Sequence, residues 1–227
     1  MHLKPFLSLA SVFHKHGFQL WLVGGSVRDY LLALPLLDVD AVTNATPEQM
    51  KVFLPQADHR FSQYGLMKLI HESYTFEITT LRIERDYKDY RHPSSIIFVQ
   101  TPIEDVVRRD FTMNGLYLDD QNHLLDYVDG QKDIAQKVIR TIGEPYGKFS
   151  EDPLRLLRAI RFQLQCGFTM EPNTQQAVRD QIDLLNQLKP QKIESEMKKL
   201  FALRHPQTRA TLNAFKVPLV YFESMLK

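Results

Sequence analysis

Short apolar runs alternate with glycine, proline and polar breaks along the first part of the chain. Apolar residues recur at helical spacing over residues 5–16, which predicts an amphipathic helix that ends at Gly17. Residues 19–23 are typical of a buried strand, and a glycine turn leads from them into a short helix over residues 26–34. Pro35 stops that helix, because proline removes a backbone donor and clashes with the preceding turn.

The alternation of strands and helices continues over the following residues. Residues 38–43 predict a strand, and Thr46 begins a helix as its N-cap, with a proline at the first helical position. Residues 66–83 predict a hairpin of two strands.

Residues 82–95 are polar and charged and have no apolar period. We therefore predict a long exposed loop there, and loops of that length in a compact domain tend to be functional or mobile. Residues 103–116 predict a helix, and short strands are expected around residues 116–119 and 124–129.

The second half of the chain has a helical pattern throughout, from Pro153 onward. No glycine/serine linker separates the two halves, and we place the boundary near Phe149, where the strands give way to helices. The predicted fold class is α+β: a domain over residues 1–149 with a small mixed sheet, and an all-α domain over residues 150–227.

Composition narrows the picture only slightly. With 44% hydrophobic and 24% charged residues, the 227-residue chain has ordinary globular values, so nothing in its composition argues for disorder. A net charge of +1 means that any RNA-binding residues must cluster locally. The single cysteine, Cys166, excludes an internal disulfide framework, and the N-terminus matches neither a signal peptide nor a membrane span. We expect a soluble, cytoplasmic protein without membrane contact.

Residues 22–29 suggest a phosphate-binding turn. A strand that ends in Gly24-Gly25 and opens a helix at Ser26 presents backbone N–H groups at a helix N-terminus, and Arg28 lies within reach of the same anion. The alternative is a tight strand-to-helix turn with a surface ion pair between Arg28 and Asp29.

A pair of aspartates follows on the next strand. Asp38 and Asp40 are two residues apart, so their side chains point the same way and can share divalent cations that hold a triphosphate. Glu77 on the neighbouring strand is the candidate third carboxylate. The alternative is an exposed strand face with solvated acids.

Two further groups combine arginines with acids. The first group is Arg108, Arg109 and Asp110, which are candidates for contacts to phosphate and sugar. Asn114 is a candidate for a structural hydrogen bond or a nucleotide contact. The alternative for the three charged residues is a solvated helix edge.

Asp152, Arg155 and Arg158 follow at near-helical spacing. One acceptor beside one donor matches the pairing edges of cytosine and adenine and rejects uracil and guanine. An intrahelical ion pair is the alternative.

Taken together, these motifs resemble the class II tRNA nucleotidyltransferase (CCA-adding enzyme) and bacterial poly(A) polymerase family, within the polymerase-β-like superfamily. The matching segments occur in family order from Leu20 to Phe168: residues 22–32, 38–43, 76–82, 85–98, 108–119, 124–134, 138–143 and 151–162. Residues 190–201 are similar to the next helical motif of the family.

The resemblance implies a nucleotidyltransferase head followed by a helical neck and body. It implies Mg²⁺ at Asp38 and Asp40 with support from Glu77, and triphosphate contacts from Arg28 and the glycine turn. It further implies sugar contacts from Arg109 and Asp110. The remaining implied role is a protein template for C and A, formed by Asp152 and Arg155 with help from Arg158.

Within the family, the resemblance favours addition of C, C and A to the 3′ end of tRNA from CTP and ATP. Residues 85–93 match a loop that goes with the switch from C to A in the family, which argues against CC-only addition. Addition of A alone, poly(A) synthesis and a non-catalytic RNA-binding remnant are the alternatives. The chain stops at Lys227, short of the body and tail usual in the family, and we expect a weaker grip on tRNA as the consequence. Gly115 stands where the family commonly has alanine. The oligomeric state does not follow from the sequence.

Overall fold

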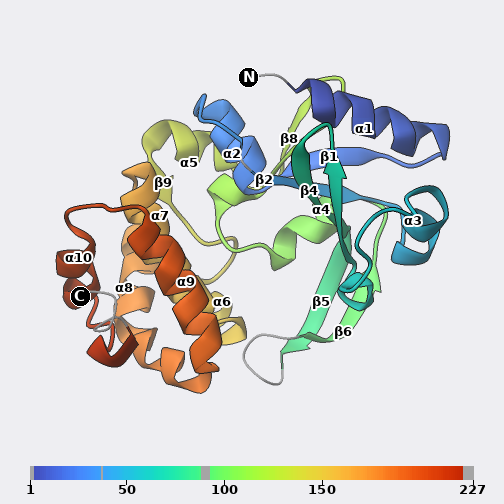
Figure 1. Ribbon diagram of the computed structural model, residues 1–227. Helices are drawn as coiled ribbons and strands as arrows, with labels where there is room; N and C mark the ends of the chain where they lie inside the picture. Colours follow the sequence, from blue (N-terminus) through green and yellow to red (C-terminus); the bar gives the residue numbers. More distant parts are fainter. Residues whose placement is uncertain (1–2, 37, 88–92, 222–227) are drawn as a thin grey trace. The chain divides into compact units, whose positions relative to one another are not determined.

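The computed structural model describes residues 3–36, 38–87 and 93–221 (Figure 1). The chain divides into two compact units, one of residues 1–85 with 95–131 and the other of residues 86–94 with 132–227. The domain boundary that we place near Phe149 lies inside the second unit, and the assignment of residues 1–149 to one domain stays a prediction.

The first unit contains a six-stranded mixed sheet. Strands β2 and β4 are parallel, and every other neighbouring pair in the sheet is antiparallel. The small mixed sheet expected from the sequence is thereby confirmed. Across the sheet, the strands are β3 (Leu66–His71), β4 (Tyr74–Thr80), β2 (Asp38–Thr43), β1 (Leu20–Val23), β7 (Leu116–Leu118) and β8 (Leu124–Asp126).

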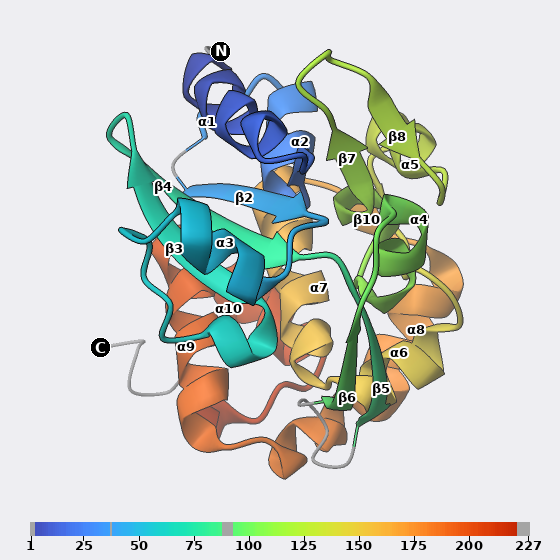
Figure 2. The ribbon, with the colours of Figure 1, turned by 90° about the vertical axis from the view of Figure 1, so that its right-hand side faces the viewer.

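Helices cover both faces of this sheet. Helices α1 (Lys4–Lys15) and α3 (Pro47–Phe53) lie on one face, and α2 (Gly25–Leu31) lies on the other (Figures 1 and 2). The rings of Phe13 and Phe53 meet edge to face at 5.1 Å, which joins α1 to α3. The three helices predicted from the sequence are present, and Thr46 caps α3 together with Gln49 in a capping box.

Alternation along the strands decides which side chains reach each face. On β4, Phe76 and Ile78 are fully buried, whereas Glu77 between them is half-buried. Successive residues of a strand point to opposite faces. The face that packs against α1 and α3 is therefore apolar, and the face on the side of α2 carries the charged groups.

Two predicted segments differ from the structure. Strands β5 (Arg82–Tyr87) and β6 (Pro93–Phe98) pair as a two-stranded sheet, so the predicted loop over residues 82–95 is wrong at both ends, and residues 88–92 lie outside the described part. Strand β5 is charged at all but two positions and β6 begins with Pro-Ser-Ser, so neither strand has the alternation of apolar and polar residues that predicts a strand.

The predicted continuous helix over residues 103–116 is also wrong. This segment contains a short helix and two 3₁₀ turns: α4 (Pro102–Asp105), η2 (Val106–Arg108) and η3 (Thr112–Asn114). Between the two turns, Arg109 has an extended backbone. Side-chain hydrogen bonds of this segment to other parts of the first unit, described below, replace a regular helix.

The second unit is built from helices around α7. Helix α7 (Leu154–Cys166) buries Leu156, Leu157 and Ile160 completely. Between α7 and α9 (Pro190–Ala202), the buried Arg161 Nε donates to Glu196 Oε1. The helical second half expected from the sequence is confirmed, with one short exception: β10 (Thr169–Met170) pairs in parallel with β9 (Val138–Ile139). The other elements are α5 (Gly130–Gln136), α6 (Pro145–Glu151), α8 (Pro172–Gln181), η4 (Ile182–Gln187), α10 (Thr208–Ala214) and η5 (Leu219–Tyr221).

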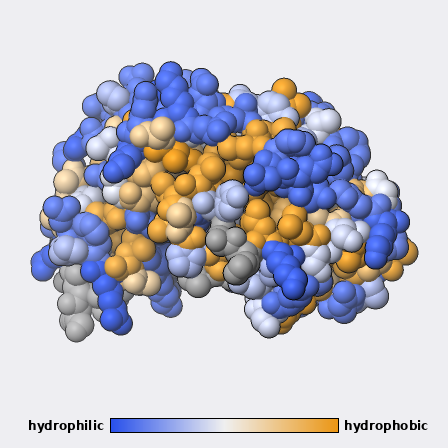
Figure 3. Space-filling view, turned by 90° about the horizontal axis from the view of Figure 1, so that it is seen from above, coloured by the Kyte–Doolittle hydropathy of each residue, from blue (hydrophilic) through white to orange (hydrophobic). Residues whose placement is uncertain are grey.

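The surface mixes polar and apolar side chains. The face seen in Figure 3 carries apolar side chains bordered by hydrophilic ones. Leu7 on α1 and Leu34 after α2 are among the exposed apolar residues of the first unit. Much of the surface of any folded protein is apolar, so exposed residues such as these are ordinary. Among the described helices, none is long and apolar enough to cross a membrane.

Candidate active site

The glycine turn before α2 lies directly against the strand that carries the aspartates. Gly24 caps α2 with φ 64°, a conformation that glycine adopts without the clash a Cβ would cause. Ser26 is buried, and its Oγ accepts a 2.8 Å hydrogen bond from the backbone N–H of Asp40. A Cβ at Gly25 would lie 3.6 Å from Asp40 Oδ2. The Asp40 carboxylate therefore lies over the turn proposed for phosphate.

The acidic residues form a row across the sheet. Asp40 on β2 is in register with Glu77 on β4, and Glu77 is in register with Lys68 on β3. Lys68 Nζ donates to Glu77 Oε1 at 2.5 Å, and this hydrogen bond raises the pKa of Lys68. Asp38 is exposed on the same side of β2 as Asp40.

Arg28 is held by residues from two separate motifs. Its side chain is buried, and it donates to Asp29 Oδ1 at 2.7 Å and to Asn114 Oδ1 at 2.8 Å. Asn114 in turn donates from Nδ2 to Asp110 Oδ1 at 3.1 Å. The ion pair with Asp29 that we considered as an alternative does form, but in a buried network that fixes the guanidinium beside the glycine turn.

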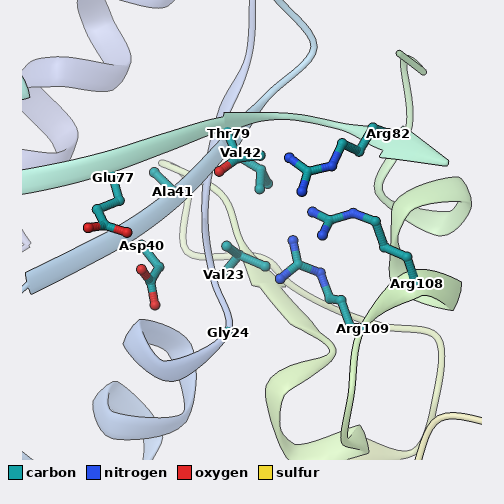
Figure 4. Close-up of a pocket in the computed structure, with 10 residues that line it drawn as sticks. All are labelled: Val23, Gly24, Asp40, Ala41, Val42, Glu77, Thr79, Arg82, Arg108 and Arg109. Carbon is teal, nitrogen blue, oxygen red and sulfur yellow. The ribbon is translucent and has the colours of Figure 1, made fainter. Parts of the chain in front are cut away.

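A pocket of about 210 Å³ opens between the acidic row and a group of arginines (Figure 4). Asp40 and Glu77 line it on one side, and Arg82, Arg108 and Arg109 extend their guanidinium groups toward it from the other. One wall can hold cations and the opposite wall can hold phosphate oxygens, which is the arrangement that a metal-bound polyphosphate requires. Its lining is completed by Val23, Gly24, Ala41, Val42 and Thr79.

Asp105 is a functional candidate that the sequence reasoning missed. This carboxylate is fully buried and accepts from Arg108 Nε at 2.8 Å, from Arg109 Nη2 at 2.7 Å and from the Tyr117 hydroxyl at 2.8 Å. Burial by itself raises the pKa of Asp105, but the charges of Arg108 and Arg109 outweigh burial and hold it well below its usual range. The i, i+3 and i, i+4 spacing of an acid before two arginines was the signal in the sequence.

Arg82 and Glu84 on β5 were also missed, because residues 82–95 were interpreted as a loop. Arg82 Nε donates to Glu84 Oε1 at 2.6 Å, and Arg108 Nη1 lies 3.6 Å from the same oxygen. Burial lowers the pKa of Arg82, and the nearby charge of Arg108 lowers it further.

The proposed template residues belong to the second unit. Asp152 Oδ1 accepts from the backbone N–H of Leu154, at the start of α7. Arg155 is buried, and its Nη1 donates to Lys148 O at 2.9 Å and to Glu151 Oε2 at 2.7 Å. The Arg158 guanidinium lies 5.2 Å from the centre of the Phe162 ring. These contacts orient Arg155 from the end of α6.

The predicted residues thus fall into three places. Gly24, Asp40, Glu77 and Arg109 line the pocket. The glycine turn and the network around Arg28 contain Gly25, Ser26, Arg28, Asp110 and Asn114. Asp38 lies on β2, outside the pocket lining. Asp152, Arg155 and Arg158 lie in the other unit. Within the described ranges, no group of three or more His, Cys, Asp or Glu residues is arranged to hold a metal ion.

Known proteins resemble the chain along most of its length. A CCA-adding enzyme from Geobacillus sp. (strain WCH70) is 39% identical over 200 residues, which is 87% of this chain and 50% of the relative. The chain spans about half the length of the curated relatives it matches.

Two solved structures are similar in fold. One is the Bacillus stearothermophilus CCA-adding enzyme in complex with CTP, with a TM-score of 0.82 and 34% identity over 92% of this chain and 50% of that one. The other is the Thermotoga maritima CCA-adding enzyme complexed with tRNA, with a TM-score of 0.75 and 25% identity over 95% of this chain and 51% of that one.

Two family profiles match consecutive parts of the chain. Residues 167–212 match the probable RNA and SrmB-binding site of polymerase A. Residues 20–140, which contain the whole pocket, match the Poly A polymerase head domain. With more than half of its residues in that match, the chain belongs to the Poly A polymerase head domain family.

Proposed function

We propose that this chain is a nucleotidyltransferase that adds C, C and A to the 3′ end of tRNA from CTP and ATP, with release of pyrophosphate. The observation that carries the proposal is the pocket that two carboxylates line on one side and three arginines on the other. The similar enzymes that are described with CTP and with tRNA support this choice of substrates. A tRNA substrate also fits the cytoplasmic location expected from the sequence. Residues 1–149 are the proposed catalytic head.

Mg²⁺ is the proposed cofactor, and the donor set fits it. Mg²⁺ prefers oxygen ligands, and it often takes only one or two protein carboxylates together with waters and substrate phosphates. Asp38 and Asp40 offer such a pair, while Glu77 is engaged by Lys68 and lies next in the row. When bound, Mg²⁺ supplies positive charge that activates the attacking hydroxyl and stabilises the leaving pyrophosphate.

The side chains of the pocket and the turn have separate proposed tasks. Backbone N–H groups at Gly25 and Ser26 face the triphosphate at the start of α2, and Arg28 completes this contact. Arg109 approaches the nucleotide from the opposite wall, while Asp110 orients Asn114 and through it Arg28. Fixed donors of this kind stabilise developing charge without reorganisation.

Base choice is assigned to Asp152 and Arg155, with Arg158 in support. An acceptor and a donor side by side complement the amino group and ring nitrogen of C and A, and leave a buried polar group unpaired with U or G. The contacts of Arg155 to the end of α6 support this role, because a template must be rigid to discriminate.

The test is incorporation of single labelled nucleotides into tRNA that lacks its 3′ CCA. CTP should add two residues, and ATP one residue after them. ATP added only to tRNA that already ends in CC would select A-only addition, and a long A tract would select poly(A) synthesis. If neither nucleotide is incorporated with Mg²⁺ present, the chain is not an enzyme of this type and the RNA-binding alternative remains.

A further inference from the structure

Two of the three arginines of the pocket, Arg108 and Arg109, bind a single buried carboxylate with their side chains. Arg108 and Arg109 are adjacent in sequence, and Arg82 arrives from β5. Three guanidinium groups around one small cavity repel one another, and each has a long side chain with several rotatable bonds. Something must hold them in place before an anion arrives.

Asp105 makes the contacts that can do this. Its Oδ1 accepts from the Arg82 backbone N–H at 3.0 Å and from Arg108 Nε at 2.8 Å. Its Oδ2 accepts from Arg109 Nε and Nη2 at 2.9 and 2.7 Å. One carboxylate therefore joins the start of β5 to the residues on either side of the break after η2.

Tyr117 on β7 braces the same arrangement. Its hydroxyl donates to Asp105 Oδ2 at 2.8 Å and accepts from Arg109 Nε at 2.9 Å. The Arg109 guanidinium also lies 5.1 Å from the centre of the Tyr117 ring. Asp105 and Tyr117 are fully buried and do not line the pocket, so they act on a ligand only through the arginines.

We propose that Asp105, braced by Tyr117, is a positioning residue that preorganises Arg108 and Arg109 to bind the polyphosphate of the incoming nucleotide. This inference rests on the proposed function only in assigning the polyphosphate to a nucleotide, since the clamp itself would bind any free polyphosphate.

Two effects of the carboxylate have opposite signs. As a negative charge near the pocket, Asp105 weakens the attraction of an anion, so its neutralisation alone would tighten binding. As a clamp, it saves the entropy that Arg108 and Arg109 would otherwise lose on binding, so its removal would weaken binding. The direction of the change therefore separates the two roles.

The experiment measures binding of inorganic tripolyphosphate to the full chain by calorimetry, without tRNA and without turnover. Asp105→Asn should weaken this binding on the order of tenfold, and Tyr117→Phe should weaken it about threefold, because each removes part of the clamp. Asp133→Asn is the matched control: Asp133 is 2% exposed and binds Arg140 in the second unit, so its loss should lower stability and leave tripolyphosphate binding unchanged.

Unchanged or tighter binding in folded Asp105→Asn would overturn the proposal. If that variant does not fold, Tyr117→Phe decides in the same way, since it keeps the ring and removes only the hydroxyl. Equal weakening by Asp133→Asn would show a general loss of stability and would also overturn it. Tripolyphosphate binding is measured without tRNA and without turnover. Failure of the proposed function would therefore appear in the nucleotide-incorporation assay and not in this binding experiment.

Discussion

At the residue scale, buried polar side chains connect motifs that are far apart in the sequence. Asn114 accepts from Arg28, which lies 86 residues earlier, and donates to Asp110. Each of these groups is nearly excluded from solvent, so each needs its partner to offset the cost of leaving water. The arrangement of the site therefore depends on residues that need not touch a substrate.

Asp40 is the residue on which we expect the reaction to depend most. Asp40→Asn should reduce nucleotide incorporation by about a thousandfold, because a metal ligand contributes several kcal/mol to the stabilisation of charge in the transition state. The fold should persist, since the substitution keeps the hydrogen bond from the residue 40 backbone N–H to Ser26 Oγ. Single-turnover incorporation of labelled CTP measures the effect.

The control for Asp40 is Asp120→Asn, an acid after β7 that lies 3.4 Å from His14. This variant should retain the activity of the unchanged chain. Activity of Asp40→Asn within tenfold of the unchanged chain would refute its assignment as a metal ligand.

Asp152 should affect the choice of base more than the rate. Asp152→Ala removes the proposed acceptor, so misincorporation of UTP and GTP relative to CTP and ATP should rise by about tenfold or more, as expected when a pairing group is lost. Competition between labelled nucleotides measures this ratio. Asp180→Ala, which removes a partner of the Tyr146 hydroxyl in the same unit, should leave the ratio unchanged. An unaltered preference in Asp152→Ala would exclude the template role.

At the element scale, local signals and tertiary contacts determine different parts of the fold. Helices with a clear start and an apolar stripe, such as α1 and α3, follow from the sequence. The segment from α4 to η3 does not, because Asp105, Arg109 and Asp110 bond to distant or neighbouring polar groups in place of a helical ladder. Strands β5 and β6 were missed because β5 is mostly charged and β6 begins with Pro-Ser-Ser, which leaves neither strand with an apolar alternation.

The capping box of α3 gives a test at this scale. Thr46→Ala should lower the free energy of unfolding by about 1 kcal/mol, because the Gln49 N–H loses its acceptor. Urea denaturation measures the change. Thr101 is a suitable comparison, since it occupies the same position before α4 without a side-chain bond to that helix's backbone, and Thr101→Ala should cost less. Equal losses in the two variants would contradict the capping contribution.

At the scale of the whole molecule, the buried carboxylate of Asp105 ties stability to pH. The pKa of Asp105 in the folded chain lies below its unfolded value of about 3.9. The ionised carboxylate therefore contributes its full stabilisation at pH values above 3.9. This contribution is lost as the pH falls below about 4 toward the lower, folded-state pKa. Asp126 and Glu171 also have lowered pKa values and add to the same trend.

We therefore expect the free energy of unfolding to fall between pH 6 and pH 3. Asp105→Asn should be less stable than the unchanged chain by about 3–5 kcal/mol at pH 6, the cost of breaking a buried charge pair, and the gap should narrow at pH 3. Urea unfolding at both pH values measures this difference, in which the shared effects of Asp126 and Glu171 cancel. A gap that stays constant would mean that Asp105 does not titrate below its unfolded value.

The sequence by itself determined the order of the main elements, the mixed sheet, the helical second half and the family, because these follow from local periodicity, caps and ordered motifs. It also placed Asp40, Glu77 and Arg109 among the candidates that line the pocket. Only the tertiary structure decided that Lys68 pairs with Glu77, that Asn114 holds Arg28 and that Asp105 and Tyr117 hold the arginines. Apart from the i, i+3 and i, i+4 spacing of Asp105 before Arg108 and Arg109, these choices depend on which buried polar groups meet across the fold, and the spacing of residues along a chain does not contain that information.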